Sequence, residues 1–180
     1  MNTYPLRMRL VEIAKRDVGQ TELTPNRSPE IAKLWPATFA PELYTDMKAK
    51  PYYGRPPYCA AAMCYWVREW LKDPEVLTAL KMTPSQAEKW RCKSPGAFAW
   101  QDWAAKKGLL VLDDSQKHTL HAGDIMVFDM SHIGLVETDH EDMVFTVEAN
   151  TGPSGGRDGD GFWTKARHRS LAKCFIRLLA

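Results

Sequence analysis

The stretch Pro56-Pro57-Tyr58-Cys59-Ala60-Ala61-Ala62-Met63 marks the point where a proline-rich loop gives way to an apolar helix. Proline is tolerated at the start of a helix but not in its interior, so the helix begins close to Cys59. From there to Lys72, apolar residues recur at the spacing of one helical face. The sequence therefore predicts a central helix over residues 59–72, packed into the core, with a thiol in its first turn.

Cys59 is a candidate nucleophile because of this position. Backbone N–H groups at a helix N-terminus favour negative charge, and the thiolate is the reactive form of cysteine. A cysteine at the start of an apolar helix is, taken alone, more often a packing residue. Cys64, deeper in the same helix, and Cys92 and Cys174 are expected to pack in the core. The assignment of Cys59 therefore depends on finding a base.

His132 and Glu148 supply the expected base and its orienting partner. The segments His132–Thr138 and Met143–Ala149 have the composition of two paired strands. A three-residue turn at residues 139–141 would set Glu148 directly opposite His132, on the same face of the sheet. A carboxylate that accepts from one imidazole nitrogen leaves the other nitrogen to act on a thiol. The pattern predicts a Cys59-His132-Glu148 site, and the competing interpretation is that both residues are ordinary strand side chains.

Further residues are assigned to the neighbourhood of this site. Gly134 is expected to leave open space beside the imidazole, and Asn150 lies two positions beyond Glu148 on the same side. The Tyr58 hydroxyl is a candidate for completing an oxyanion hole. Trp35 and Trp163 are candidates for the cleft wall. The loop at residues 155–161 lacks the later acidic ligand of a calcium loop and is interpreted as a turn, so we expect no metal and no cofactor.

The chain has 180 residues, of which 44% are hydrophobic, and a formal net charge of +2. This is the size of one domain, spanning residues 1–180, without a basic tract for nucleic acid. Helical patterns fill residues 1–110 and short β-rich segments fill residues 120–180. The order predicts an α+β fold in which N-terminal helices, including the nucleophile helix, pack on a C-terminal antiparallel sheet. No stretch is long enough to span a membrane, and no signal peptide is recognised, so we expect a chain made in the cytoplasm with reduced thiols.

Four segments together resemble the CHAP family of peptidoglycan hydrolases, within the NlpC/P60-like class of papain-related cysteine amidases and endopeptidases. They are Pro57-Tyr58-Cys59-Ala60-Ala61, residues 122–128, residues 131–137 and Val147-Glu148-Ala149-Asn150-Thr151-Gly152. The resemblance implies a papain-like fold, with Cys59 as nucleophile, His132 as base, and Glu148 and Asn150 in support. Tyr58 stands where many relatives have Trp, and Ala149 where Gly is common.

The resemblance implies a monomeric enzyme that cuts an amide bond of peptidoglycan, either the muramoyl-alanine amide or a bond of the stem or cross-bridge peptide. Without a wall-binding repeat, the chain is more similar to phage lysins or injected antibacterial effectors than to modular autolysins. Such an enzyme would reach the cell wall by lysis, a holin pore or a secretion machine, and an effector would have an immunity partner. Two alternatives stay open: an inactive relative that binds the wall, and a thiol protease or transferase acting on a protein.

Overall fold

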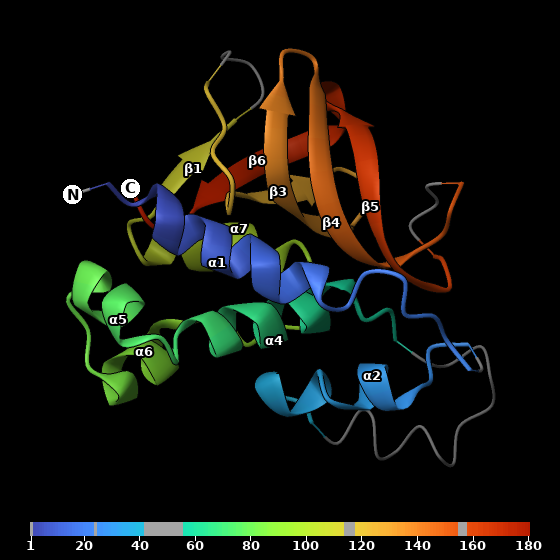
Figure 1. Cartoon of the computed structure of the whole chain (residues 1–180), viewed down its shortest axis with the longest axis horizontal. Coiled ribbons are helices and arrows are strands. Elements are labelled where there is room, and N and C mark those ends of the chain that lie inside the picture. The colour runs from blue at the N-terminus through green and yellow to red at the C-terminus, as the bar shows by residue number, and fades with distance from the viewer. Residues whose placement is uncertain (1, 24, 42–55, 114–117, 155–157) are drawn as a thin grey trace.

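The computed structural model describes residues 2–23, 25–41, 56–113, 118–154 and 158–180. Within them, helices gather on one side of a curved six-stranded sheet (Figure 1). Helix α1 (Tyr4–Lys15) and helix α4 (Cys59–Trp70) lie side by side, and each contacts strands of the sheet. The helical first half and the β-rich second half confirm the predicted α+β class.

Local sequence signals set the N-termini of three helices. Ser28 Oγ accepts a hydrogen bond from Ile31 N at 3.2 Å, and Asp73 and Thr83 cap two later helices in the same way. Proline follows each of these three caps, in the first turn, where its missing N–H costs nothing. The remaining helical elements are α2 (Pro29–Ala32), the 3-10 turn η1 (Trp35–Ala37), α5 (Pro74–Leu80), α6 (Pro84–Trp90) and α7 (Ala99–Lys106).

The six strands form one antiparallel sheet in the order β1-β6-β2-β3-β4-β5. Strands β2 to β5 follow one another as a meander, and β6 returns to pair with β2. The short β1, which the sequence interpretation missed, pairs with β6 at the edge. Their bounds are β1 (Leu110–Leu112), β2 (Ile125–Phe128), β3 (Ile133–His140), β4 (Met143–Thr151), β5 (Gly161–His168) and β6 (Ala172–Arg177), with the 3-10 turn η3 (Arg169–Leu171) between the last two.

Alternation along the strands divides the core between the two faces of the sheet. Ile133, Leu135 and Val147 belong to the larger cluster, which includes the apolar face of α4. Val136 and Val144 face the other way, into a smaller cluster. Two indoles tie the helices together: Trp70 Nε1 donates to Leu6 O at 2.7 Å, and Trp66 Nε1 donates to Asp17 Oδ2 at 2.8 Å. The predicted packing of the central helix in the core is confirmed.

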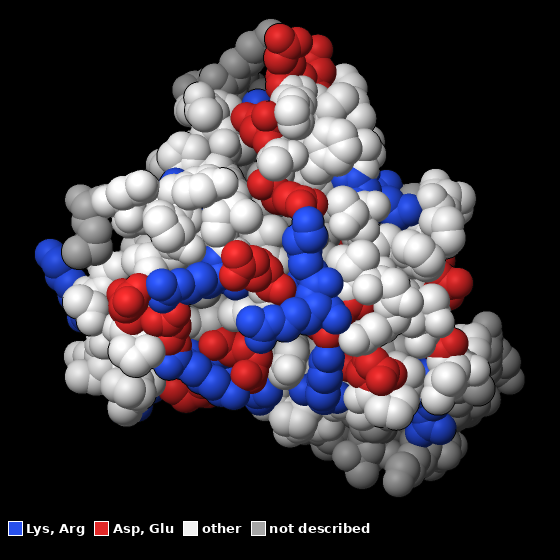
Figure 2. Space-filling view, viewed as in Figure 1, with Lys and Arg blue, Asp and Glu red and all other residues white. Residues whose placement is uncertain are grey.

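The proline-rich loop before α4 lies largely outside the described residues, because residues 42–55 are not among them. On the face that carries α1, Figure 2 shows basic and acidic side chains intermixed. Arg9, for example, pairs with Asp73 at 2.5 Å and with Glu75 at 2.6 Å. Among the residues that the structure describes, no helix is both long enough and apolar enough to cross a membrane.

Candidate active site

Cys59 is the first residue of α4, and its side chain is almost enclosed, with 5% of the residue exposed. The helix begins here because Pro56 and Pro57 cannot stand in a helix interior and Tyr58 occupies the N-cap position. The Tyr58 side chain does not cap this end. The first backbone N–H groups of α4 are therefore left to stabilise negative charge beside the thiol.

The hairpin that carries His132 and Glu148 is built differently from the prediction. Its turn has two residues, since His140 pairs with Met143, and a bulge between Val136 and Thr138 adds a residue to β3. Glu148 consequently lies opposite Gly134 and not opposite His132, so the predicted pairing is wrong by two positions. A displacement of two residues keeps both side chains on one face, because strand side chains alternate with a period of two.

His132 and Glu148 are nevertheless in contact. His132 directly precedes β3, after a tight turn in which Ser131 has φ of 58° and Phe128 N donates to His132 O at 2.9 Å. His132 Nε2 lies 2.9 Å from Glu148 Oε2, and both side chains are fully buried. An ionised carboxylate only accepts hydrogen bonds, so Nε2–H donates to it. Diagonal neighbours on a sheet are within reach of long side chains, which explains the contact.

This contact leaves His132 Nδ1 unused. Nδ1 is buried and has no hydrogen-bond partner within the described part of the chain. Burial acts to lower the pKa of His132, but interaction with Cys59 and with Glu148 outweighs burial and raises that pKa to about 9. Cys59, from the helix, and Glu148, from the sheet, thus act on the same imidazole and favour its charged form.

Arg167 is a site residue that the sequence interpretation missed. From β5 it grips the carboxylate of Glu148 with two hydrogen bonds, Nε to Oε1 at 2.8 Å and NH2 to Oε2 at 2.5 Å. Thr146 Oγ1 donates to the same Oε1 at 2.6 Å. Burial acts to raise the pKa of Glu148, but the bonds from Arg167 and His132 lower it to about 2. The sequence contained only a weak signal for this role, which is that Arg167 stands at an alternating position of a strand. The sequence alone does not distinguish an arginine buried at such a position from an exposed one.

Gly134 does not leave the open space that was predicted. A Cβ at this position would lie 2.9 Å from Glu148 Cγ and 3.4 Å from Thr146 Cβ. The space beside the imidazole is therefore filled by the glutamate itself. Gly134 thus allows Glu148 to approach β3 closely, and its assignment to substrate binding stays a prediction.

Asn150 lies in a second β-bulge, between Ala149 and Thr151, with φ of 58°. The bulge turns its side chain toward the nucleophile helix, where Oδ1 accepts a hydrogen bond from Tyr58 N at 3.4 Å. Asparagine tolerates this left-handed conformation better than most residues. Asn150 thus ties the end of β4 to the residue that precedes Cys59, which is a different position from the predicted one beside Glu148.

The three aromatic residues assigned to substrate binding differ in their exposure. Tyr58 is fully buried, and its ring packs on Phe162 with centroids 5.6 Å apart. Burial, together with the nearby carboxylate of Glu22, raises the pKa of its phenol. Trp35 is 1% exposed and belongs to the core. Both rings are buried among the described residues, so their assignment to substrate binding stays a prediction that their burial does not support. Trp163 is partly exposed and pairs with Glu148 across β4 and β5.

The remaining cysteines are core residues, as predicted. Cys64, Cys92 and Cys174 are buried, and burial raises the pKa of Cys64 well above its usual value and those of Cys92 and Cys174 to about 11. None of the four cysteines forms a disulfide. Among the described residues, no group of three or more His, Cys, Asp or Glu side chains is arranged to hold a metal ion. Residues 155–157 of the loop considered for calcium lie outside the described residues.

A cavity of about 570 Å³ adjoins the N-terminus of α4. Pro57, two residues before the nucleophile, and Asn150 both line it. Three carboxylates stand on its wall, those of Glu22, Asp158 and Asp160. The cavity lies next to the Tyr58-Asn150 contact, and Cys59 is not among the described residues that line it.

Comparisons of the chain with family models, with curated proteins and with solved structures find no match.

Proposed function

We propose that this protein is a cysteine hydrolase that cuts an amide bond, with Cys59 as nucleophile, His132 as acid and base, and Glu148 as the orienting group. The observation that carries the proposal is the buried pair in which Glu148 holds Nε2 of His132, while Nδ1 is unbonded and Cys59 lies near enough to raise the pKa of the imidazole. A nucleophile, a base in contact with it and a third group that orients the base make the arrangement expected of nucleophilic catalysis.

The reaction would proceed in two steps. The Cys59 thiolate attacks the carbonyl carbon, and the N–H groups at the start of α4 stabilise the oxyanion that forms. His132 then gives its proton to the leaving amine, which departs as the acyl-enzyme forms. In the second step His132 takes a proton from water, the resulting hydroxide attacks the thioester, and the acid product leaves as the Cys59 thiolate and the His132 imidazolium are restored. Glu148 keeps the imidazole in one orientation throughout.

Peptidoglycan is the proposed substrate because of the resemblance of the segments around Cys59, His132 and Glu148 to CHAP and NlpC/P60-like enzymes. With that substrate the protein would act on the bacterial cell wall after export or lysis, as a phage lysin or a secreted effector. The proposed fold relationship is papain-like, which is consistent with an N-terminal nucleophile helix packed against an antiparallel sheet.

The test is digestion of purified sacculi of several stem-peptide chemistries, with the released fragments identified by mass spectrometry. Cys59→Ala is the inactive variant, and Cys64→Ala is its matched control, since it removes a thiol from the same helix at a position in the core. We expect release by the wild type and by Cys64→Ala, and a loss of roughly 10³-fold or more in Cys59→Ala.

Release that persists in Cys59→Ala would exclude the thiol mechanism. No release by the wild type from any sacculus, with the protein folded, would exclude peptidoglycan hydrolysis. The same preparation would then be tested for binding to sacculi and for cleavage of denatured protein, which separates a wall-binding relative from a thiol protease.

A further inference from the structure

Arg167 contacts Glu148 in a way that bears on catalysis and not only on stability. Its two bonds to the carboxylate and the bond from Thr146 together engage both oxygens of Glu148. Arg167 NH2 also donates to Thr151 Oγ1 at 3.3 Å, which fixes the guanidinium itself. With the carboxylate held on one side, Oε2 keeps a single direction toward His132 Nε2.

The ring of Phe128 lies against both His132 and Arg167, the two cationic partners of Glu148. Its ring centroid lies 5.2 Å from that of His132 and 5.5 Å from the guanidinium carbon of Arg167. His132 and Glu148 are fully buried, and the Arg167 side chain is 8% exposed. Water therefore has little access to the carboxylate, and its charge depends on the groups that touch it. The charged groups facing it are His132, before β3, and Arg167, on β5, with Cys59 of α4 beyond the imidazole.

We propose that Arg167 is a positioning residue of the cysteine site, which acts through Glu148 by holding that buried carboxylate ionised and turned toward His132. The proposal rests on the proposed role of Cys59 and His132 but not on peptidoglycan as the substrate. Removing the guanidinium would leave a buried carboxylate with one cationic partner in place of two. Glu148 would then take up a proton at a higher pH, and the imidazolium that stabilises the Cys59 thiolate would lose its counter-charge.

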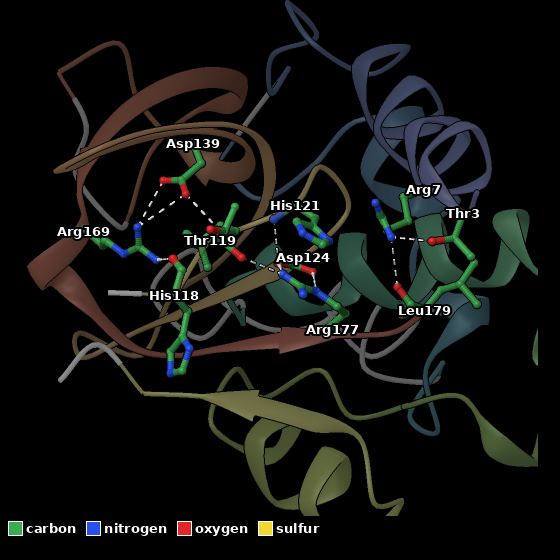
Figure 3. Close-up of polar contacts among 11 residues, drawn as sticks. Thr3, Arg7, His118, Thr119, His121, Asp124, Asp139, Arg169, Arg177 and Leu179 are labelled. Carbon is green, nitrogen blue, oxygen red and sulfur yellow. Dashed lines mark hydrogen bonds and ion pairs between the residues drawn. The ribbon is translucent and has the colours of Figure 1, made fainter. Parts of the chain in front are cut away.

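The structure offers a matched control for this change. Arg177, on β6, grips Asp124 with the same pair of bonds, Nε to Oδ1 at 3.0 Å and NH2 to Oδ2 at 2.7 Å (Figure 3). It also donates to a third acceptor, Thr119 O at 2.9 Å, and its side chain is 11% exposed. Loss of Arg177 breaks an equivalent buried fork without touching His132, Glu148 or Cys59.

The experiment measures alkylation of Cys59 by iodoacetamide as a function of pH, read by mass spectrometry of the Cys59 peptide. Wild type, Arg167→Met and Arg177→Met are compared within the pH range where circular dichroism shows each to be folded. The alkylation rate rises with pH as the thiolate forms, and this rising part of the profile is its acid limb. We expect the acid limb of Arg167→Met to lie about one pH unit or more higher than that of the wild type, which is roughly tenfold slower alkylation at a given pH on that limb. The limb of Arg177→Met should coincide with that of the wild type.

An acid limb that stays at the wild-type position in Arg167→Met would overturn the proposal, as would an equal movement in Arg177→Met. If Arg167→Met fails to fold, Arg167→Lys is tested in its place, because lysine keeps the positive charge but loses the paired bonds to the Glu148 carboxylate. We then expect an unmoved limb with a lower plateau rate, and an unchanged plateau would refute positioning. Because no peptidoglycan is used, failure of the sacculus digestion with a shifted limb would remove the substrate assignment and leave the role of Arg167 intact.

Discussion

Glu148 stands directly opposite Gly134 in the β3–β4 ladder, and a methyl group on Gly134 would lie 2.9 Å from Glu148 Cγ. The glutamate thus fills the volume that a side chain would take, two residues from His132 on the same face. Glycine at this position is what allows the carboxylate to lie against β3 and meet the imidazole diagonally.

Gly134→Ala is therefore expected to displace Glu148. Overpacking at this buried point should lower the free energy of unfolding by about 1–3 kcal/mol, and it should slow any reaction of Cys59 that depends on His132. Urea unfolding and the alkylation rate measure the two effects. Gly96→Ala is the control, since its nearest neighbour would be Ser94 Oγ at 3.6 Å. Unaltered stability and alkylation in Gly134→Ala would contradict the close packing.

Asn150 combines a left-handed backbone with a side-chain bond to Tyr58 N, and two variants separate these features. Asn150→Gly keeps the conformation and loses the bond, whereas Asn150→Ala loses both. We expect the alanine variant to be about 1 kcal/mol less stable than the glycine variant, and both to show the same loss of hydrolysis. A glycine variant with wild-type hydrolysis would show that the amide does not help to place Cys59.

Hydrolysis and alkylation should differ in their response to alkaline pH. The pKa of His132 is raised to about 9, so its proton is present below that pH and is lost as the pH rises through it. Amide hydrolysis needs this proton for the leaving amine and should fall through about pH 9, whereas alkylation needs only a thiolate and should not. Both rates are measured from pH 6 upward on one preparation. A parallel decline of the two rates would argue against His132 as the acid.

Native alkylation should also be selective among the four cysteines. Burial raises the pKa values of Cys64, Cys92 and Cys174, so these thiols stay protonated near pH 8 and are enclosed. Cys59 lies at a helix N-terminus beside His132. We expect mass spectrometry after brief exposure to iodoacetamide to find the label on Cys59 alone, and on all four cysteines after denaturation. Labelling of a core cysteine at the rate of Cys59 would contradict this placement.

The sequence by itself determined most of the helices and strands and the shared face of His132 and Glu148. Proline, cap residues and apolar spacing are local signals, so the start of α4 at Cys59 and the helices after Asp73 and Thr83 could be predicted from neighbours in the chain. Strand alternation is local too, which is why the shared face of His132 and Glu148 was predicted correctly although the register was not.

Tertiary structure alone decided how the pair is held. The β3 bulge, the bulge at Asn150 and the meeting of Arg167 with Glu148 depend on contacts between segments distant in sequence, and no local pattern encodes them. The same holds for Tyr58 and Trp35, whose burial depends on which surfaces pack over them. The alternation of side chains along a strand determines which face of the sheet a residue occupies. Only the packed sheet determines which residue stands opposite it on the next strand, and that pairing is what brings Arg167 to Glu148.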